Sequence, residues 1–288
     1  MVMLRLMGGL GNQLFQYAVG RSLAVKHQTD LFLDIGWFSQ VPGIDSTRQF
    51  ELGLFEIKAA VASHKLLSDV GGDDFSFAGR LKTKVLSAGK YGKYKFYEAG
   101  YDKKIEQVQD NSYLKGYFQS EKYFTAIENR LRHELVFKNE LGYRQHPLYK
   151  QIISAESVSL HIRRGDYTKT GTHGICSPEY YRKAIEYIKQ NISGDIKIFI
   201  FSDEPAWVKE EMEIKDAVIV DNTDAGLAHI DFFLMSCCKH HIIANSSYSW
   251  WAAWLNPSKE KIVVAPEWWS ATHRTINIDL FMQGMQIL

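Results

Sequence analysis

The chain has 288 residues, which is long for a single compact core, so two domains of similar size are expected. Apolar residues make up 45% and charged residues 23% of the sequence, proportions that argue against a disordered chain. The formal net charge is only +1, which excludes a global electrostatic attraction to nucleic acid and leaves recognition to local sites.

Cysteine content and hydropathy favour a cytoplasmic protein. The three cysteines, Cys176, Cys237 and Cys238, form neither an even disulfide framework nor a paired zinc-ligand pattern. No stretch reaches the roughly 18 to 20 apolar residues that a membrane-spanning helix needs. The apolar run 1–7 contains Arg5 and is unlike a signal peptide.

The first 35 residues predict a strand over residues 2–7, a glycine loop over 8–11, a helix over 12–27 and a strand over 31–35. Apolar residues of the helix recur at three- and four-residue spacing, which gives it one buried face. This order is typical of the opening of a parallel sheet. The signal is weaker from residue 36 to residue 141.

Strands and helices alternate from residue 157 onward. The expected strands are 157–162, 196–201, 217–220, 241–244 and 261–265, and the expected helices are 178–190, 205–212, 224–237 and 248–255. Such alternation requires a parallel sheet covered by helices on both faces. We therefore predict an α/β protein of two Rossmann-like domains, residues 1–150 and 151–288.

The glycine loop predicts an anion site, because it follows a strand and opens a helix whose backbone N–H groups are free. Its candidate residues are Gly9, Gly11, Asn12 and Gln13. A dinucleotide fingerprint would need glycine where Leu14 stands, and the ending of a P-loop is absent. The alternative is a tight turn in which Asn12 simply caps the helix.

Residues 161–167 read His-Ile-Arg-Arg-Gly-Asp-Tyr and follow a buried strand. In an open parallel sheet this junction lies at the carboxyl edge, where ligands bind. The planar fork of Arg163 matches two phosphate oxygens and keeps its charge. The alternative is an ordinary ion pair of Arg163 with Asp166, and Arg164 is interpreted as structural.

Three further strand ends carry polar side chains that either cap the next helix or contact a nucleotide. The candidates are Ser202, Asp203, Asp221, Ser246, Ser247 and Ser249. An aspartate at a strand end can accept two hydrogen bonds from a guanine base. The tryptophans that follow Ser249 are expected in the core.

The chain contains no Asp-x-Asp, the usual carboxylate clamp for a metal on a nucleotide sugar, and its histidines lack ligand spacing. No metal site is predicted, so Arg163 and the helix starts must neutralise a diphosphate. The basic and aromatic stretch 80–104 is interpreted as a solvated face, with contact to an anionic lipid surface as the alternative.

Taken together, segments 5–17, 161–167, 201–204 and 246–251 resemble the α-1,2-fucosyltransferases of glycosyltransferase family 11, whose bacterial members are similar in length. The resemblance implies a GT-B-like fold, with two Rossmann-like domains whose parallel sheets face a central cleft. It makes residues 1–150, with the glycine loop, the acceptor-side domain and residues 151–288 the GDP-fucose-binding domain. It implies GDP-β-L-fucose as donor, no metal or other cofactor, and inversion to an α-1,2 linkage on O2 of a terminal β-galactose. The implied acceptor is an O-antigen or similar glycan, carried free or on a lipid at the membrane.

The resemblance also implies residue roles. Arg163 contacts the β-phosphate, His161 and Asp221 face the guanosine, and Ser246 and Ser247 donate to the phosphates.

Asn12 is implied to lie near the transferred fucose. Asp166 is either the catalytic base or a brace for Arg163. The rival interpretations are a non-catalytic glycan- or nucleotide-binding protein and a protein O-fucosyltransferase.

Overall fold

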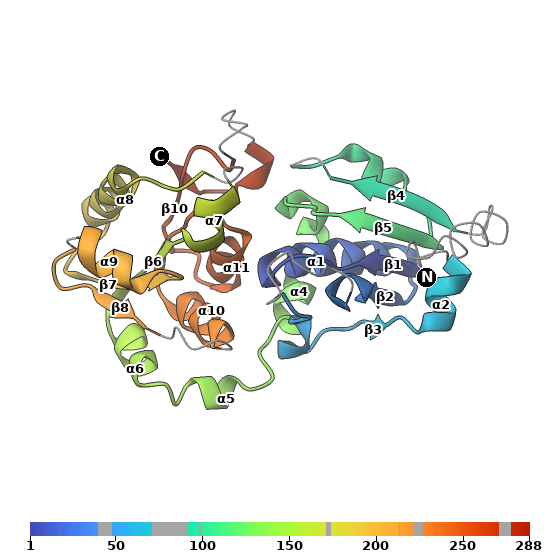
Figure 1. Ribbon diagram of the computed structural model, residues 1–288, viewed down its shortest axis with the longest axis horizontal. Helices are drawn as coiled ribbons and strands as arrows, with labels where there is room; N and C mark the ends of the chain where they lie inside the picture. Colours follow the sequence, from blue (N-terminus) through green and yellow to red (C-terminus); the bar gives the residue numbers. More distant parts are fainter. Residues whose placement is uncertain are drawn as a thin grey trace. The chain divides into compact units, whose positions relative to one another are not determined.

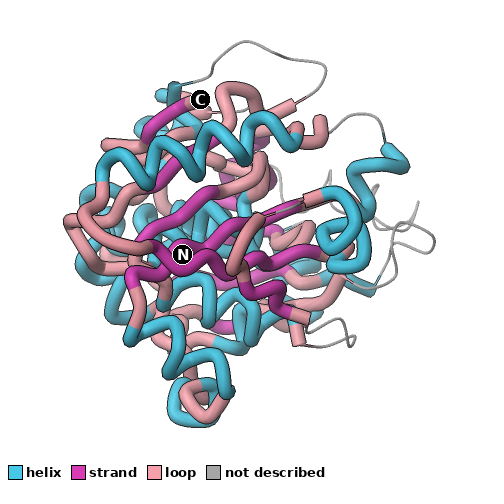
Figure 2. The backbone as a smooth tube through the Cα atoms, turned by 90° about the vertical axis from the view of Figure 1, so that its left-hand side faces the viewer, coloured by secondary structure: helices cyan, strands magenta, loops and turns pink. Residues whose placement is uncertain are grey.

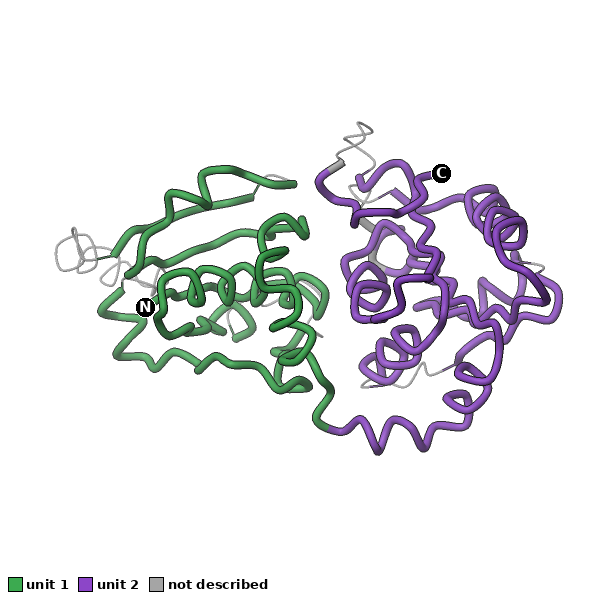
Figure 3. The backbone as a smooth tube through the Cα atoms, turned by 180° about the vertical axis from the view of Figure 1, so that it is seen from behind, with its two compact units in different colours: residues 1–138 green, residues 139–288 purple. Residues whose placement is uncertain are grey.

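The protein is described here by a computed structural model that covers residues 1–39, 48–70, 91–97, 100–170, 174–212, 214–221, 227–270 and 278–288. The chain forms two compact units, unit 1 from Met1 to Lys138 and unit 2 from Asn139 to Leu288 (Figure 3). No helix in the described ranges is both long enough and apolar enough to cross a membrane.

Unit 1 is built on a parallel sheet in the order β3-β2-β1-β5-β4. Its strands are β1 (Val2–Arg5), β2 (Leu31–Asp34), β3 (Ala60–Val61), β4 (Gly92–Phe96) and β5 (Ser112–Gly116). Its helices are α1 (Leu10–His27), α2 (His64–Val70) and α4 (Glu128–Glu134), with short 3-10 turns η1 (Gly36–Ser39), η2 (Leu52–Leu54), η3 (Lys103–Gln107), η4 (Glu121–Tyr123) and η5 (Thr125–Ile127).

Unit 2 carries a second parallel sheet in the order β11-β10-β9-β6-β7-β8. Its strands are β6 (Glu156–Ile162), β7 (Ile196–Ser202), β8 (Val218–Val220), β9 (His240–Ile242), β10 (Val263–Ala265) and β11 (Gln286–Ile287). Its helices are α5 (Glu140–Tyr143), α6 (Pro147–Ser154), α7 (Gly165–Thr170), α8 (Pro178–Asn191), α9 (Pro205–Glu211), α10 (Ala228–Cys237) and α11 (Ser247–Leu255), followed by the turn η6 (Ile278–Leu280).

Both sheets are purely parallel among the described strands, as the alternating sequence predicted (Figures 1 and 2). Parallel neighbours cannot be joined by a tight hairpin, so the chain crosses over between them through the intervening helices. The predicted α/β class with two parallel-sheet units is confirmed.

The strands of unit 2 place alternate residues on opposite faces of the sheet. Val158, Leu160 and Ile162 belong to one apolar cluster with residues of α8 and α9. The alternate residues Ser157, Ser159 and His161 therefore face the opposite side, where polar groups are buried.

The two units divide between Lys138 and Asn139, although the sequence placed residues 139–150 in the N-terminal domain. Phe137 pairs with Phe55 in an antiparallel bridge, and Lys138 N–H donates to Leu54 O, which holds this end of unit 1. Helix α6 instead contacts α10 and β6, so it belongs to unit 2.

The paired histidines of unit 2 are structural, as expected. His240 accepts at Nδ1 from Ile262 N–H and lies 2.9 Å from Glu156 through Nε2. His241 is fully buried between Ser159 and Asn256, at 2.8 and 3.0 Å. Both rings are therefore engaged within the protein.

Trp250, Trp251 and Trp254 are also buried, with at most 3% exposure, so the expected core role of these tryptophans is confirmed.

A buried ion pair connects two helices of unit 1. Glu134 of α4 receives hydrogen bonds from Arg21 and from the hydroxyl of Tyr17, both on α1. Only 7% of the Glu134 side chain and 14% of that of Arg21 are exposed. Burial and the bond to Glu134 raise the pKa of Tyr17, so the phenol remains a donor.

We predict that Glu134→Ala destabilises unit 1 by about 3 kcal/mol, because it leaves Arg21 charged and unpaired in a buried position. The matched control is Glu128→Ala, which removes an exposed ion pair with Arg132 on the same helix and costs about 0.5 kcal/mol. Chemical denaturation of both variants measures the difference. Equal losses would show that the Arg21 pair is not an anchor of α1.

Candidate functional site

Asp203 connects the ends of two neighbouring strands of unit 2. One carboxylate oxygen lies 3.0 Å from Arg163 Nη1, and the other accepts a 3.0 Å hydrogen bond from the backbone N–H of Arg164. A Cβ on Gly165 would lie 2.7 Å from Asp203 Oδ2, so glycine permits this close approach. The carboxylate holds the guanidinium of Arg163 at the carboxyl edge of the sheet.

Arg164 points to different partners. Its Nε lies 3.0 Å from Glu204, and its guanidinium stacks 3.8 Å from the ring centre of Trp207. These contacts confirm the structural role expected for Arg164. The two adjacent arginines therefore have different partners, Asp203 for the side chain of Arg163 and Glu204 for that of Arg164.

Three polar residues of β6 lie on the buried face opposite α8, and they differ in their partners. Ser157 accepts from Lys239 N–H at 3.1 Å, and Ser159 bonds to His241 at 2.8 Å. His161, the last of the three, has no hydrogen-bond partner for Nδ1 among the described residues. A buried polar atom without a partner is costly unless a ligand supplies one.

His161 is neutral. Burial, and secondarily the positive charge of Arg163, lower the pKa of its imidazole to about 3. Its ring lies 5.6 Å from that of Tyr248, the second residue of α11. An uncharged imidazole therefore lies near the first turn of α11, within the electrostatic influence of Arg163.

The amino end of α11 is not capped by a side chain. Ser246 occupies the cap position with 6% exposure, and its hydroxyl makes no capping bond. Ser247 is half-buried, whereas Ser249 is fully buried and donates to Ser246 O at 3.3 Å. The N–H groups and two serine hydroxyls are thus suited to an anion, and Ser249 is engaged internally.

The remaining predicted residues of unit 2 lie at the ends of β7 and β8. Ser202 accepts from Glu204 N–H at 3.0 Å, which shapes the turn into α9. Asp221 follows β8, is half exposed, and lies 3.2 Å from Lys209. Asp203 does not cap α9, since it is engaged with the two arginines.

The backbone of Asp166 lies in the first turn of α7, and its side chain is outside the described part of the structure.

The glycine loop of unit 1 is reinforced by amide side chains. Gln13 is fully buried, donates to Gly8 O and Gln49 O, and accepts from Glu51 N–H. Asn12 accepts a 2.9 Å bond from Gln119 and does not cap α1, whose cap position is Gly9. Gln13 therefore supports the loop.

Gly9 lies at the start of α1, and Gly11 is buried within it.

Arg48 and Glu51 were missed by sequence reasoning. Arg48 Nη1 lies 2.7 Å from where a Cβ of Gly9 would be. Burial raises the pKa of the Glu51 carboxyl. The positive charge of Arg48 and a hydrogen bond with the backbone of Leu10 lower it, but by less. The protein's own carboxylate therefore occupies the amino end of α1, and no sequence motif marks it.

Asn245, which directly precedes the candidate Ser246, was also missed. It is 2% exposed and donates to Gly174 O and Trp269 O at 2.8 and 3.2 Å. The backbone carbonyl of Asn245 accepts from the hydroxyl of Tyr167 at 3.3 Å. Asn245 thus links the start of α11 to the segments at Gly174 and Trp269 through its side-chain amide, and to α7 through its backbone.

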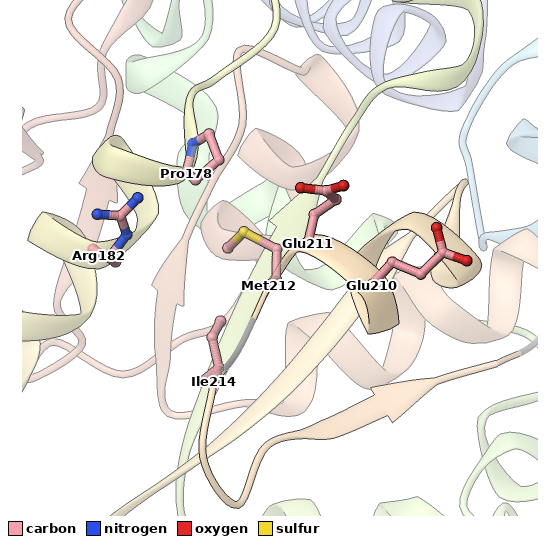
Figure 4. Close-up of a pocket in the computed structure, with 6 residues that line it drawn as sticks. All are labelled: Pro178, Arg182, Glu210, Glu211, Met212 and Ile214. Carbon is pink, nitrogen blue, oxygen red and sulfur yellow. The ribbon is translucent and has the colours of Figure 1, made fainter.

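A hollow of about 350 Å³ lies elsewhere in unit 2, between the start of α8 and the end of α9 (Figure 4). It is lined by Pro178, Arg182, Glu210, Glu211, Met212 and Ile214. None of the predicted site residues contributes to it. In the described ranges no group of three or more histidine, cysteine or acidic side chains is arranged to hold a metal.

Comparison with known proteins gives the family. The model of "Glycosyl transferase family 11" matches residues 82–284, more than half of the chain. The chain is 35% identical to the Escherichia coli O-antigen biosynthesis glycosyltransferase WbnK, covering 92% of this chain and 94% of the relative. It is 33% identical to an Escherichia coli alpha-1,2-colitosyltransferase, covering 93% and 92%.

A more distant relative is a Caenorhabditis elegans galactoside 2-alpha-L-fucosyltransferase, 27% identical over 51% of this chain and 43% of the relative. The fold matches that of the NodZ alpha-1,6-fucosyltransferase crystal soaked with GDP-fucose, with a TM-score of 0.52 at 16% identity over 89% and 92% of the chains. The chain belongs to glycosyltransferase family 11.

Proposed function

We propose that the protein transfers L-fucose from GDP-β-L-fucose to O2 of a terminal β-galactose, with inversion and without a metal. One observation carries the donor side of the proposal: Arg163, neutral His161 and the uncapped start of α11 follow the neighbouring parallel strands β6 and β9 at the carboxyl edge of the sheet. A guanidinium and helix N–H groups bind a diphosphate, and the unpartnered nitrogen suits the nucleoside.

The acceptor side follows from the relatives, two of which are named for O-antigen biosynthesis and for galactoside fucosylation. We propose a β-galactose end of an O-antigen-type glycan, free or lipid-linked. The rival transferred sugar is colitose, because another relative is named as a colitosyltransferase.

In the proposed reaction, galactose O2 attacks the anomeric carbon of fucose as the bond to the β-phosphate breaks. Positive charge develops on the sugar ring, and negative charge builds on the leaving diphosphate. Arg163 stabilises that negative charge, and Ser246 and Ser247 add donors. Asn12 contacts the transferred sugar.

We assign Asp166 as the base that accepts the proton of galactose O2. The motif left open whether this carboxylate is a base or a brace for Arg163. Asp203 already holds Arg163 at 3.0 Å, which supplies the brace and supports the assignment of Asp166 as the base.

The decisive experiment incubates the protein with GDP-fucose and β-galactosides in the presence of EDTA. We expect an α-1,2-fucosylated product, identified by linkage analysis, at a rate that the chelator does not change. GDP-colitose and an acceptor peptide are run in parallel. A preference for GDP-colitose would correct the donor, and fucosylation of the peptide alone would overturn the acceptor.

We predict that Arg163→Lys lowers kcat/KM for GDP-fucose by about 100-fold or more, because an ammonium cannot reproduce the planar fork. The control is Arg182→Lys, which changes an exposed guanidinium beside the hollow of α8 and α9 and should leave kcat/KM unaltered. A GDP-release assay measures both. Near-normal turnover of the Arg163 variant would remove this residue from the leaving-group site.

We predict that Asp166→Asn lowers kcat by about 100-fold while the Kd for GDP stays unchanged, since a base acts on the acceptor and not on the nucleotide. Calorimetry with GDP and a transfer assay separate the two quantities. A loss of GDP affinity would assign Asp166 to bracing Arg163, and unchanged kcat would exclude it as the base.

A further inference from the structure

Unit 1 exposes an aromatic pair that the nucleotide chemistry does not use. Tyr97 is 52% and Tyr117 is 38% exposed, and they are the aromatic members of the large apolar side chains exposed in the described ranges. Their ring centroids lie 6.3 Å apart. The ring planes are inclined at 65°, so the two exposed rings pack edge to face as one aromatic pair.

The pair lies at the carboxyl edge of the sheet, directly after β4 and β5 (Figure 1). Phe96 pairs with Gly116, and Tyr117 N–H donates to Phe96 O at 3.1 Å. The parallel register brings the residues that follow, Tyr97 and Tyr117, side by side. This edge also carries the glycine loop after β1.

The backbone next to Tyr117 is in an unusual conformation. Phe118 has φ +53° and is fully buried, with its ring 5.3 Å from Phe96 and 5.6 Å from Tyr123. The left-handed region is disfavoured for a bulky residue, and such positions cluster at ligand sites. This turn buries Phe118 and leaves Tyr117 exposed.

The same turn brings an amide to the glycine loop. Gln119 Nε2 donates to Asn12 Oδ1 at 2.9 Å. Asn12 and Gln119 retain amide groups that can donate to or accept from hydroxyls. The aromatic pair and the two amides thus follow neighbouring strands at the same edge of the sheet.

We propose that Tyr97 and Tyr117 form the platform on which the acceptor sugar stacks, with Asn12 and Gln119 at its edge. A pyranose has a face of C–H groups, which packs on aromatic rings, and a rim of hydroxyls, which bonds to amides. Small-ligand sites combine aromatic walls with a few polar groups in this way. The identity of the sugar as a β-galactoside rests on the proposed function.

The test compares Tyr97→Ala/Tyr117→Ala with Tyr97→Phe/Tyr117→Phe. We expect the alanine pair to raise the KM for methyl β-galactoside about tenfold or more, and the phenylalanine pair to keep it within about twofold, because stacking needs the ring and not the hydroxyl. The KM for GDP-fucose and GDP release without acceptor should not change. The control Ile153→Ala removes a side chain of similar exposure, 51%, from α6.

The outcomes separate the platform from the proposed function. An unchanged acceptor KM in the alanine pair overturns the platform, as does an equal loss of donor affinity, which would indicate a structural role. Loss of binding to anionic vesicles with an unchanged acceptor KM would assign the pair to a membrane surface instead. If saturation-transfer NMR shows that wild type binds methyl β-galactoside and the alanine pair does not, the platform holds even where transfer fails.

Discussion

The carboxylate of Asp203 is the contact on which the candidate site of unit 2 depends. It reaches the side chain of Arg163 and the backbone of Arg164 at once, so it couples the loop after β6 to the loop after β7. An arginine at a strand end has many rotamers, and a diphosphate site needs one of them. The ion pair selects that rotamer before any ligand arrives, which is the physical basis of preorganisation.

Most elements of unit 2 could be predicted within a few residues, because apolar residues recur in most of its strands and the helices α8, α9 and α11 begin at a proline or a serine. Pro178 and Pro205, for example, each open a helix in the structure. Unit 1 was harder. In the edge strand β4 the exposed Lys93 and Lys95 alternate with the partly buried Gly92 and Tyr94, so its sequence is typical of a solvated basic segment.

In the candidate site, residues within a local motif could be predicted, whereas their partners from distant parts of the sequence could not. A motif predicts which residue types stand at a strand end, and Arg163, His161 and Ser246 were placed at strand ends in this way. Their partners were not, since Asp203 is 40 residues from Arg163 and no spacing rule joins them. The amide of Gln13 was expected to face a ligand and is engaged internally, and the left-handed backbone of Phe118 is one that sequence preference opposes.

The three indoles of α11 have a consequence for its first turn. Trp250, Trp251 and Trp254 are packed against one another at 5.0–5.2 Å between neighbouring ring centroids, and Trp250 Nε1 is fixed to Leu280 O. A helix anchored so firmly has little conformational freedom left to lose. For the anion proposed at Ser246 and Ser247, the entropy lost on binding would therefore fall on the ligand, because the N–H groups of the first turn are already held in place.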